Sequence, residues 1–166
     1  RGMSSAASDV YKRQFVNITT DKCYLNEELG IPFKENDHLG GKDIYSASKA
    51  SSEIVTKAYR DSFFNSSKCS IATARAGNVI GGGDWSNDRL IPDIVRALNS
   101  DKSPEIRAPE SVRPWQHVLD PLFGYLNLAQ NLYINESYDE AWNFGPNEDG
   151  FITCLLYTSD AADDIP

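Results

Sequence analysis

The stretch Ile44-Tyr45-Ser46-Ala47-Ser48-Lys49 opens a predicted helix, and both the fold and the chemistry of the chain are inferred outward from it. Residues four apart lie on one face of a helix, so Tyr45 and Lys49 point the same way. An ammonium beside a phenol favours the phenolate, which can accept a proton from a hydroxyl group. In a chain with eight tyrosines such a pair also arises by chance, as two solvated neighbours. The pair therefore indicates a catalytic site only if the neighbouring sequence supports one.

Two predicted strands lie on either side of this helix in the sequence. Residues 15–20 (FVNITT) are typical of a short buried strand that ends in polar residues, and residues 69–76 (CSIATARA) predict the next strand. Open α/β sheets carry their ligand sites at the carboxyl ends of such strands. The glycines of the loop 77–83 let the backbone approach a ligand, and the Asn78 amide can donate to a diphosphate or a hydroxyl; taken alone, this loop is as often a plain turn.

Five ordered motifs resemble the extended short-chain dehydrogenase/reductase family, which includes the sugar-nucleotide epimerases and dehydratases. They are Thr20–Tyr24 (TDKCY), Tyr45–Lys49 (YSASK), Arg75–Trp85 (RAGNVIGGGDW), Arg113–Val118 (RPWQHV) and Trp142–Pro146 (WNFGP). The resemblance extends from Phe15 to Ile152, and the order of the motifs makes it far more specific than any one of them.

The resemblance implies an α/β fold: the C-terminal part of a Rossmann-like doubly wound parallel sheet, with a small nucleotide-sugar-binding lobe, mainly residues 80–120, inserted in residues 15–153. It also implies NAD as cofactor and a nucleotide sugar as substrate. The implied cofactor-binding residues are Thr19, Tyr45, Lys49, Ala76, Asn78 and Val79. The implied substrate-binding residues are Asn78, Arg89, Leu90, Arg113 and His117, although either arginine alone is more typical of a surface side chain.

The implied catalytic residues are Thr20, Asp21, Lys22, Tyr45 and Lys49. In the implied reaction Tyr45 takes the proton of the sugar 4-hydroxyl, Lys49 stabilises the phenolate, and Thr20 hydrogen-bonds the same oxygen. A protonated Asp21 then assists loss of the 6-hydroxyl as water.

Lys22 separates the branches of the family. The dTDP-glucose 4,6-dehydratases carry glutamate at this position, so Lys22 and the Gly81–Trp85 motif favour the branch that acts on CDP-glucose. Lys22 either is the base, which requires desolvation or a neighbouring cation, or it polarises a water or stabilises an enolate. Three alternatives stay open: a dTDP-glucose dehydratase, a sugar-nucleotide 4-epimerase, and a fragment without catalytic activity.

Composition excludes several classes of protein. The net charge of −8 and the pI near 4.7 argue against nucleic-acid and anionic-membrane binding. The sequence has no long apolar run or signal peptide, which predicts a cytoplasmic protein. Three cysteines and two histidines, widely spaced, suggest neither disulfides nor a metal site.

The ends and the first half of the fold carry further expectations. Residues 1–14 and 154–166 lack the pattern of the body and are expected to be a non-native leader and tail. The sequence contains no Gly-x-Gly-x-x-Gly fingerprint, so we expect the dinucleotide-binding half of the enzyme to be missing.

Several elements are predicted by local signals. The first helix is expected to start after an Asp43 N-cap, to run to about Phe63 and to bury the apolar set Ala47, Ala50, Ile54, Val55, Ala58 and Phe63. The resemblance makes this helix the interface of a homodimer in the full-length protein; packing within one subunit is the alternative. Further elements are a strand at 105–107, a last strand at 142–145, and helices at 90–98 and 120–133, the latter capped by Asp120.

Overall fold

A computed structural model describes residues 13–64, 69–147 and 151–154. The chain forms two compact units. The first comprises Arg1–Ala76 and Leu122–Phe144, and the second comprises Gly77–Pro121 and Gly145–Pro166. The leader and tail expected from the sequence lie largely at residues 1–12 and 155–166, outside the described residues.

The first unit is built on a parallel sheet of three strands in the order β1-β2-β6. The strands are β1 (Arg13–Ile18), β2 (Cys69–Ala76) and β6 (Ala141–Phe144). Strand β1 pairs with β2 from Arg13↔Cys69 onward, so it begins two residues before its predicted start. The prediction of a parallel α/β sheet is confirmed.

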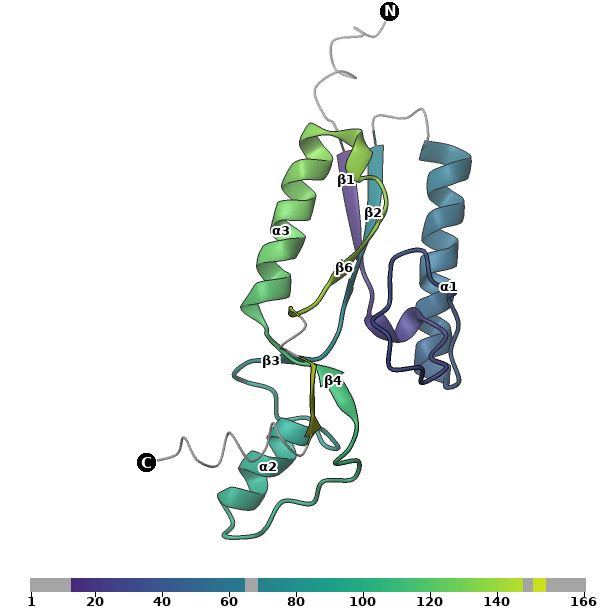
Figure 1. Ribbon diagram of the computed structural model, residues 1–166. Helices are drawn as coiled ribbons and strands as arrows, with labels where there is room; N and C mark the ends of the chain where they lie inside the picture. The colour runs from purple at the N-terminus through teal and green to yellow at the C-terminus, as the bar shows by residue number, and fades with distance from the viewer. Residues whose placement is uncertain (1–12, 65–68, 148–150, 155–166) are drawn as a thin grey trace, which may run out of the picture. The chain divides into compact units, whose positions relative to one another are not determined.

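One helix covers each face of this sheet, as Figure 1 shows with α1 in blue and α3 in green. On one face, Leu128 and Leu132 of α3 (Leu119–Ile134) pack against Ala72 and Ala74 of the central strand. The small alanines let the helix approach the strand closely, and the 3₁₀ turn η4 (Glu136–Tyr138) then leads into β6. The apolar core of the unit therefore lies between α3 and β2.

Helix α1 (Ile44–Tyr59) covers the other face and continues into a π-helical turn, η3 (Arg60–Phe64). The predicted start is confirmed, because Asp43 caps the helix by accepting from the Ser46 N–H at 3.0 Å. The predicted buried face is wrong. Only Ala50 of the predicted set is buried, and Ser46, Glu53 and Thr56 are the other buried residues. The physical reason is that β2 turns Thr73 and Arg75 toward α1, so the helix meets them with polar side chains.

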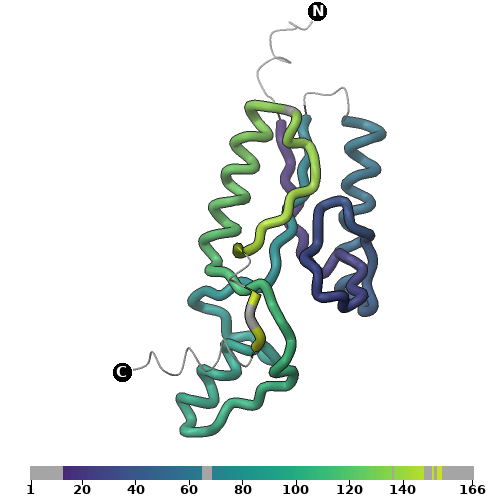
Figure 2. Tube along the Cα trace, viewed as in Figure 1, coloured from purple at the N-terminus to yellow at the C-terminus, as the bar shows by residue number. Residues whose placement is uncertain are grey.

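The long connection 24–43 between β1 and α1 folds back against the start of the helix, as the dark segment in Figure 2 shows. It follows a 3₁₀ turn, η2 (Asp21–Cys23), and its residues Tyr24, Phe33 and Leu39 pack with Cys23 and Ala50. This second small core attaches η2 to α1. The connection is otherwise irregular apart from one bridge, Tyr24↔Leu39.

The second unit contains helix α2 (Leu90–Leu98), which has its predicted bounds, and two small sheets. Strand β3 (Val79–Ile80) pairs in parallel with β5 (Gln116–His117), and β4 (Val112–Pro114) pairs antiparallel with β7 (Phe151–Thr153). Cys154, assigned above to the tail, follows β7 directly and donates its N–H to the Ser111 carbonyl at 3.0 Å.

Two local predictions in this unit are wrong. Residues 105–107 form no strand: Pro104 and Pro109 restrict the segment, and Arg107 turns to Asp88 at 3.1 Å and Asp93 at 3.7 Å. Asp120 is inside α3 rather than its cap, because the helix begins one residue earlier. There the Leu119 N–H donates to His117 Nδ1 at 3.3 Å.

Candidate active site

Two ammonium groups from different elements converge on one phenol in the first unit. The Nζ of Lys49, one turn along α1, lies 5.9 Å from the ring centroid of Tyr45, and the Nζ of Lys22, from η2, lies at 5.8 Å. Tyr45 is 51% exposed, so a solute can reach the ring. In general, a cation close to a phenol oxygen favours the phenolate, and here two ammonium groups lie over one tyrosine ring. The cluster suits removal of a proton from a substrate.

The turn that carries Lys22 is held by its own side chains. Thr20 caps η2 with its Oγ1, which accepts from the Lys22 N–H at 3.4 Å, and its hydroxyl donates to Asp21 Oδ1 at 3.0 Å. Thr20 is buried, whereas Asp21 is partly exposed. The carboxyl of Asp21 and the ammonium of Lys22 are thus presented by one short, capped turn that packs against α1.

The start of α1 is fixed tightly, and this sets the position of Tyr45. Asp43 accepts from both the N–H and the hydroxyl of Ser46, and these hydrogen bonds hold the pKa of its carboxyl below the ordinary value. Gly41 lies against the same turn. A Cβ on Gly41 would come within 2.4 Å of the Ala47 nitrogen, so only glycine allows this approach.

Two further predicted residues lie at strand ends of the first unit. Thr19 is 8% exposed, and its hydroxyl donates to the carboxylate of Glu53 in the interior. Ala76 closes β2 and is 7% exposed. The hydroxyl of Thr19 therefore has an internal partner, and its backbone N–H donates to the Ala74 carbonyl at 2.8 Å.

The remaining predicted site residues belong to the second unit. There Asn78 and Val79 lie beside the strand that carries His117. The Asn78 carbonyl accepts from the Gln116 N–H at 3.1 Å, and Val79 pairs with Gln116 beside His117. Arg89 is exposed at the N-cap position of α2, directly before Leu90, and makes no side-chain capping bond. Arg113 is exposed on β4, with its Nη1 at 3.4 Å from the Val112 carbonyl.

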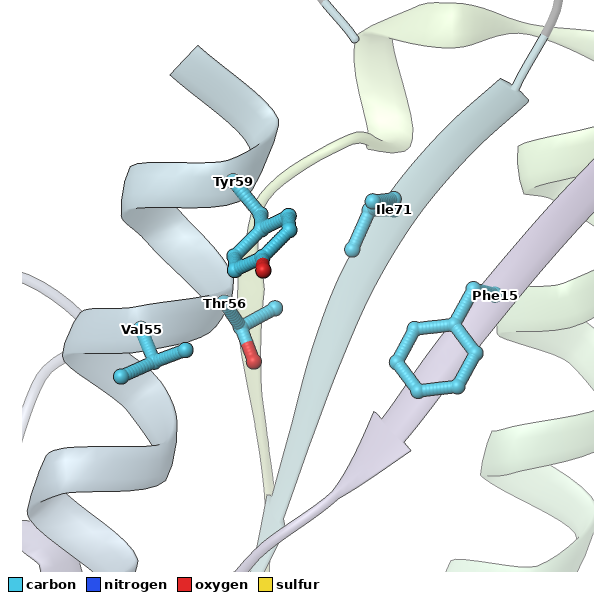
Figure 3. Close-up of a pocket in the computed structure, with 5 residues that line it drawn as sticks. All are labelled: Phe15, Val55, Thr56, Tyr59 and Ile71. Atoms are coloured by element: carbon cyan, nitrogen blue, oxygen red, sulfur yellow. The ribbon is translucent and has the colours of Figure 1, made fainter. Parts of the chain in front are cut away.

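An apolar groove of the first unit lies away from this cluster. Figure 3 shows Val55, Thr56 and Tyr59 of α1 facing Ile71 of β2 and Phe15 of β1 across it. These helix residues come two to four turns after Tyr45, and the lining carries no ionisable side chain except the Tyr59 phenol. The groove is therefore a packing surface rather than a part of the candidate active site.

Known proteins match this chain over most of its length. The sequence profile of the NAD dependent epimerase/dehydratase family matches residues 3–145. The chain belongs to this family. Among curated relatives, the CDP-glucose 4,6-dehydratase of Salmonella typhimurium is 51% identical over 140 residues, which cover 81% of this chain and 39% of that protein.

Solved structures of family members show the same fold. The UDP-N-acetylglucosamine 4-epimerase of Methanobrevibacter ruminantium superposes with a TM-score of 0.73 at 20% identity, covering 91% of this chain and 46% of that one. The dTDP-glucose 4,6-dehydratase of Bacillus anthracis, solved with NAD, gives 0.71 at 22% identity, covering 89% and 44%. The chain thus spans under half the length of these family members and has their Rossmann-like fold.

Sequence reasoning missed the buried ion pair between Glu53 and Arg75, which lies next to the family's YxxxK motif. The two side chains are 2% and 4% exposed, and Arg75 Nη2 lies 2.8 Å from Glu53 Oε2. A signal for it exists. An arginine in the otherwise apolar and small strand CSIATARA needs a buried acid, and Glu53 lies four residues after Lys49 on the same helix.

Proposed function

We propose that the protein to which this chain belongs is an NAD-dependent sugar-nucleotide dehydratase that converts CDP-glucose to CDP-4-keto-6-deoxyglucose. The observation that carries the proposal is the placement of Lys22 beside the Tyr45–Lys49 pair. A relative named CDP-glucose 4,6-dehydratase is 51% identical over the matched residues, which supports this substrate over dTDP-glucose.

The donor set of the first unit fits one end of NAD. A nicotinamide ribose needs hydroxyl partners beside the reacting carbon, and Lys49 offers its ammonium there next to an accessible phenol. Thr19, directly after β1, and Ala76, the last residue of β2, lie at the edge where α/β sheets bind nucleotides. When bound, NAD supplies the acceptor and later the donor of the hydride that the reaction moves.

Each residue of the cluster then has one task. Tyr45, as phenolate, removes the proton of the sugar 4-hydroxyl while Lys49 stabilises its charge. The 4-ketone formed acidifies the C5 proton, and Lys22 either takes that proton or stabilises the enolate. Asp21, if protonated, donates a proton to the departing 6-hydroxyl, so water leaves across C5 and C6.

In the second unit, Arg89 and Arg113 are proposed to bind the diphosphate and ribose of the substrate. Both are exposed, and Arg89 lies at the N-terminus of α2, where backbone N–H groups also favour anions. Asn78, Leu90 and His117 complete the proposed substrate contacts.

A chimera tests the substrate assignment. Residues 13–154 of this chain would replace the matching segment of the Salmonella dehydratase, and CDP-glucose, dTDP-glucose and a UDP-sugar would be offered. We expect a 4-keto-6-deoxy sugar from CDP-glucose, at a kcat/KM at least about tenfold above that for dTDP-glucose, equivalent to about 1.4 kcal/mol. A 4-epimerised sugar as the product, or a preference for dTDP-glucose, would refute the proposal.

Two substitutions in the same chimera separate the two chemical stages. Tyr45→Phe removes the base and is expected to lower kcat by about 10²–10⁴-fold with no reduced cofactor appearing. Asp21→Asn leaves oxidation intact but slows elimination, so the absorbance of the reduced cofactor rises transiently and decays slowly. If Asp21→Asn shows no such accumulation, Asp21 does not act in elimination.

We also propose that the protein is a cytoplasmic homodimer that meets its partner through α1. Support comes from the apolar side chains that α1 and the turn η3 after it leave in solvent: Ile54 and Val55 of α1 are 56% and 54% exposed, and Phe63 of η3 is 69% exposed. No helix among the described residues is long and apolar enough to span a membrane.

A further inference from the structure

A buried polar cluster joins α1 to the central strand of the first unit. The carboxylate of Glu53 accepts from the hydroxyls of Thr19 and Thr73 and from the guanidinium of Arg75, the last two at 2.8 Å. Burial alone would raise the pKa of Glu53, but the hydrogen bonds from Arg75, Thr19 and Thr73 outweigh it and hold the pKa below the ordinary value. Glu53 is therefore a buried carboxylate whose charge is matched by Arg75.

Arg75 extends the cluster in the opposite direction. Its Nη1 donates to the Tyr24 hydroxyl at 2.7 Å and to the Glu35 carbonyl at 2.9 Å, and its guanidinium lies over the Tyr24 ring at 5.0 Å. The Tyr24 hydroxyl in turn donates to Asn143 Oδ1 of β6 at 2.6 Å. The ion pair thus reaches the loop that follows η2.

The two ends of the cluster bracket the turn that presents Asp21 and Lys22. Thr19, which binds Glu53, lies next to Thr20, the N-cap of that turn, and Tyr24, which binds Arg75, directly follows the turn. Glu53 itself lies one helical turn beyond Lys49 and two turns beyond Tyr45. One ion pair therefore ties both ends of the turn to the helix that carries the phenol and its lysine.

Packing alone gives a poor account of this pair. A buried ion pair commonly adds little net stability, because desolvation offsets the attraction, and apolar residues of similar volume do as well. Tyr45 and Lys49 share one helix, whereas Lys22 comes from η2, so its range of approach to Tyr45 is set by where the η2 backbone is held. In active sites a misplacement of about 1 Å lowers rates markedly.

We propose that Glu53 and Arg75 are positioning residues for the Tyr45 site. They hold the turn of Asp21 and Lys22 at a fixed distance from Tyr45 and Lys49. The reaction they would serve is the proposed function, on which this inference rests for its purpose, but the positioning itself is measurable on the 166-residue chain without substrate or cofactor.

The experiment uses four variants of that chain and two readouts. Thr19→Val and Tyr24→Phe each remove one tether while keeping side-chain shape, Glu53→Gln removes the charge, and Leu132→Ala is the control, a fully buried residue on the opposite face of the sheet. The readouts are hydrogen exchange of the Cys23 and Tyr24 amides, which close η2, and the fluorine NMR signal of 3-fluorotyrosine at position 45, assigned by its loss in Tyr45→Phe.

We expect each tether variant to speed exchange of the η2 amides about tenfold relative to amides of α3, the factor that loss of one hydrogen bond gives. The Tyr45 fluorine signal should shift or split in the same variants. Leu132→Ala should speed exchange in α3 and leave the Tyr45 signal in place. Thr19→Val and Tyr24→Phe carry the test if Glu53→Gln does not fold.

Two results would overturn positioning. One is uniform acceleration of exchange with an unmoved Tyr45 signal in the tether variants, which indicates a purely structural pair. The other is an equal movement of that signal in Leu132→Ala. Neither readout depends on turnover, so a chimera that epimerises its substrate or prefers dTDP-glucose would refute the proposed function and leave this result standing.

Discussion

At the scale of the residue, the carboxylate of Glu53 makes the stability of the chain depend on pH in a defined way. Its pKa in the folded state lies below the ordinary value of 4.5, so the folded state binds a proton less readily than the unfolded state does. The stabilisation is therefore complete above pH 4.5 and is lost as the pH falls through the folded-state pKa. Protonation of Glu53 should therefore contribute to acid unfolding.

We predict that Glu53→Gln lowers the free energy of unfolding by about 3–5 kcal/mol at pH 7, because it leaves the Arg75 charge buried without a counter-ion. In the variant, the part of the acid dependence that comes from Glu53 disappears, so its unfolding free energy falls less steeply below pH 4.5. Urea unfolding between pH 7 and pH 3 measures both effects. Asp61→Asn, in the exposed Lys57–Asp61 pair, is the control and should change little. Parallel pH profiles for wild type and Glu53→Gln would contradict the assignment.

At the scale of the element, α1 shows what the sequence predicts well and where it fails. Its start at the Asp43 cap follows from local chemistry, as do the bounds of β2 and α2, and all three were predicted. The side of α1 that is buried was not predictable from its apolar spacing, because it depends on the arginine and threonine that β2 presents.

The start of α1 also depends on a residue outside it. An alanine at position 41 would place its Cβ 2.4 Å from the Ala47 nitrogen and 2.6 Å from the Ser46 Cβ. Backbone atoms cannot move aside as a flexible side chain can, so we predict that Gly41→Ala lowers the free energy of unfolding by about 1–3 kcal/mol. Thermal unfolding should show a drop of about 2–4 °C for each kcal/mol. Gly82→Ala is the control, since its Cβ meets nothing within 4 Å; equal melting of the two variants would show that Gly41 has room.

At the scale of the whole molecule, both long helices expose large apolar residues, but the residues that they bury on the opposite side differ in polarity. Helix α3 also exposes large apolar residues, among them Leu126 at 71%. On α1 the exposed apolar residues lie opposite a polar buried face, which is the reverse of an ordinary amphipathic helix at a protein surface. An exposed apolar patch of this kind marks an interaction surface.

If the proposed dimer forms through α1, substitutions on the exposed faces of α1 and α3 should affect dimerisation differently. In the chimera with the Salmonella dehydratase, we predict that Ile54→Glu raises the dimer dissociation constant at least about tenfold, since a buried carboxylate without a partner costs more than 1.4 kcal/mol. Leu126→Glu makes the same change on α3 and should leave the dimer intact. Sedimentation velocity over a range of protein concentrations measures both. If the dimer persists in Ile54→Glu, or if Leu126→Glu weakens it equally, the dimer interface does not lie on α1.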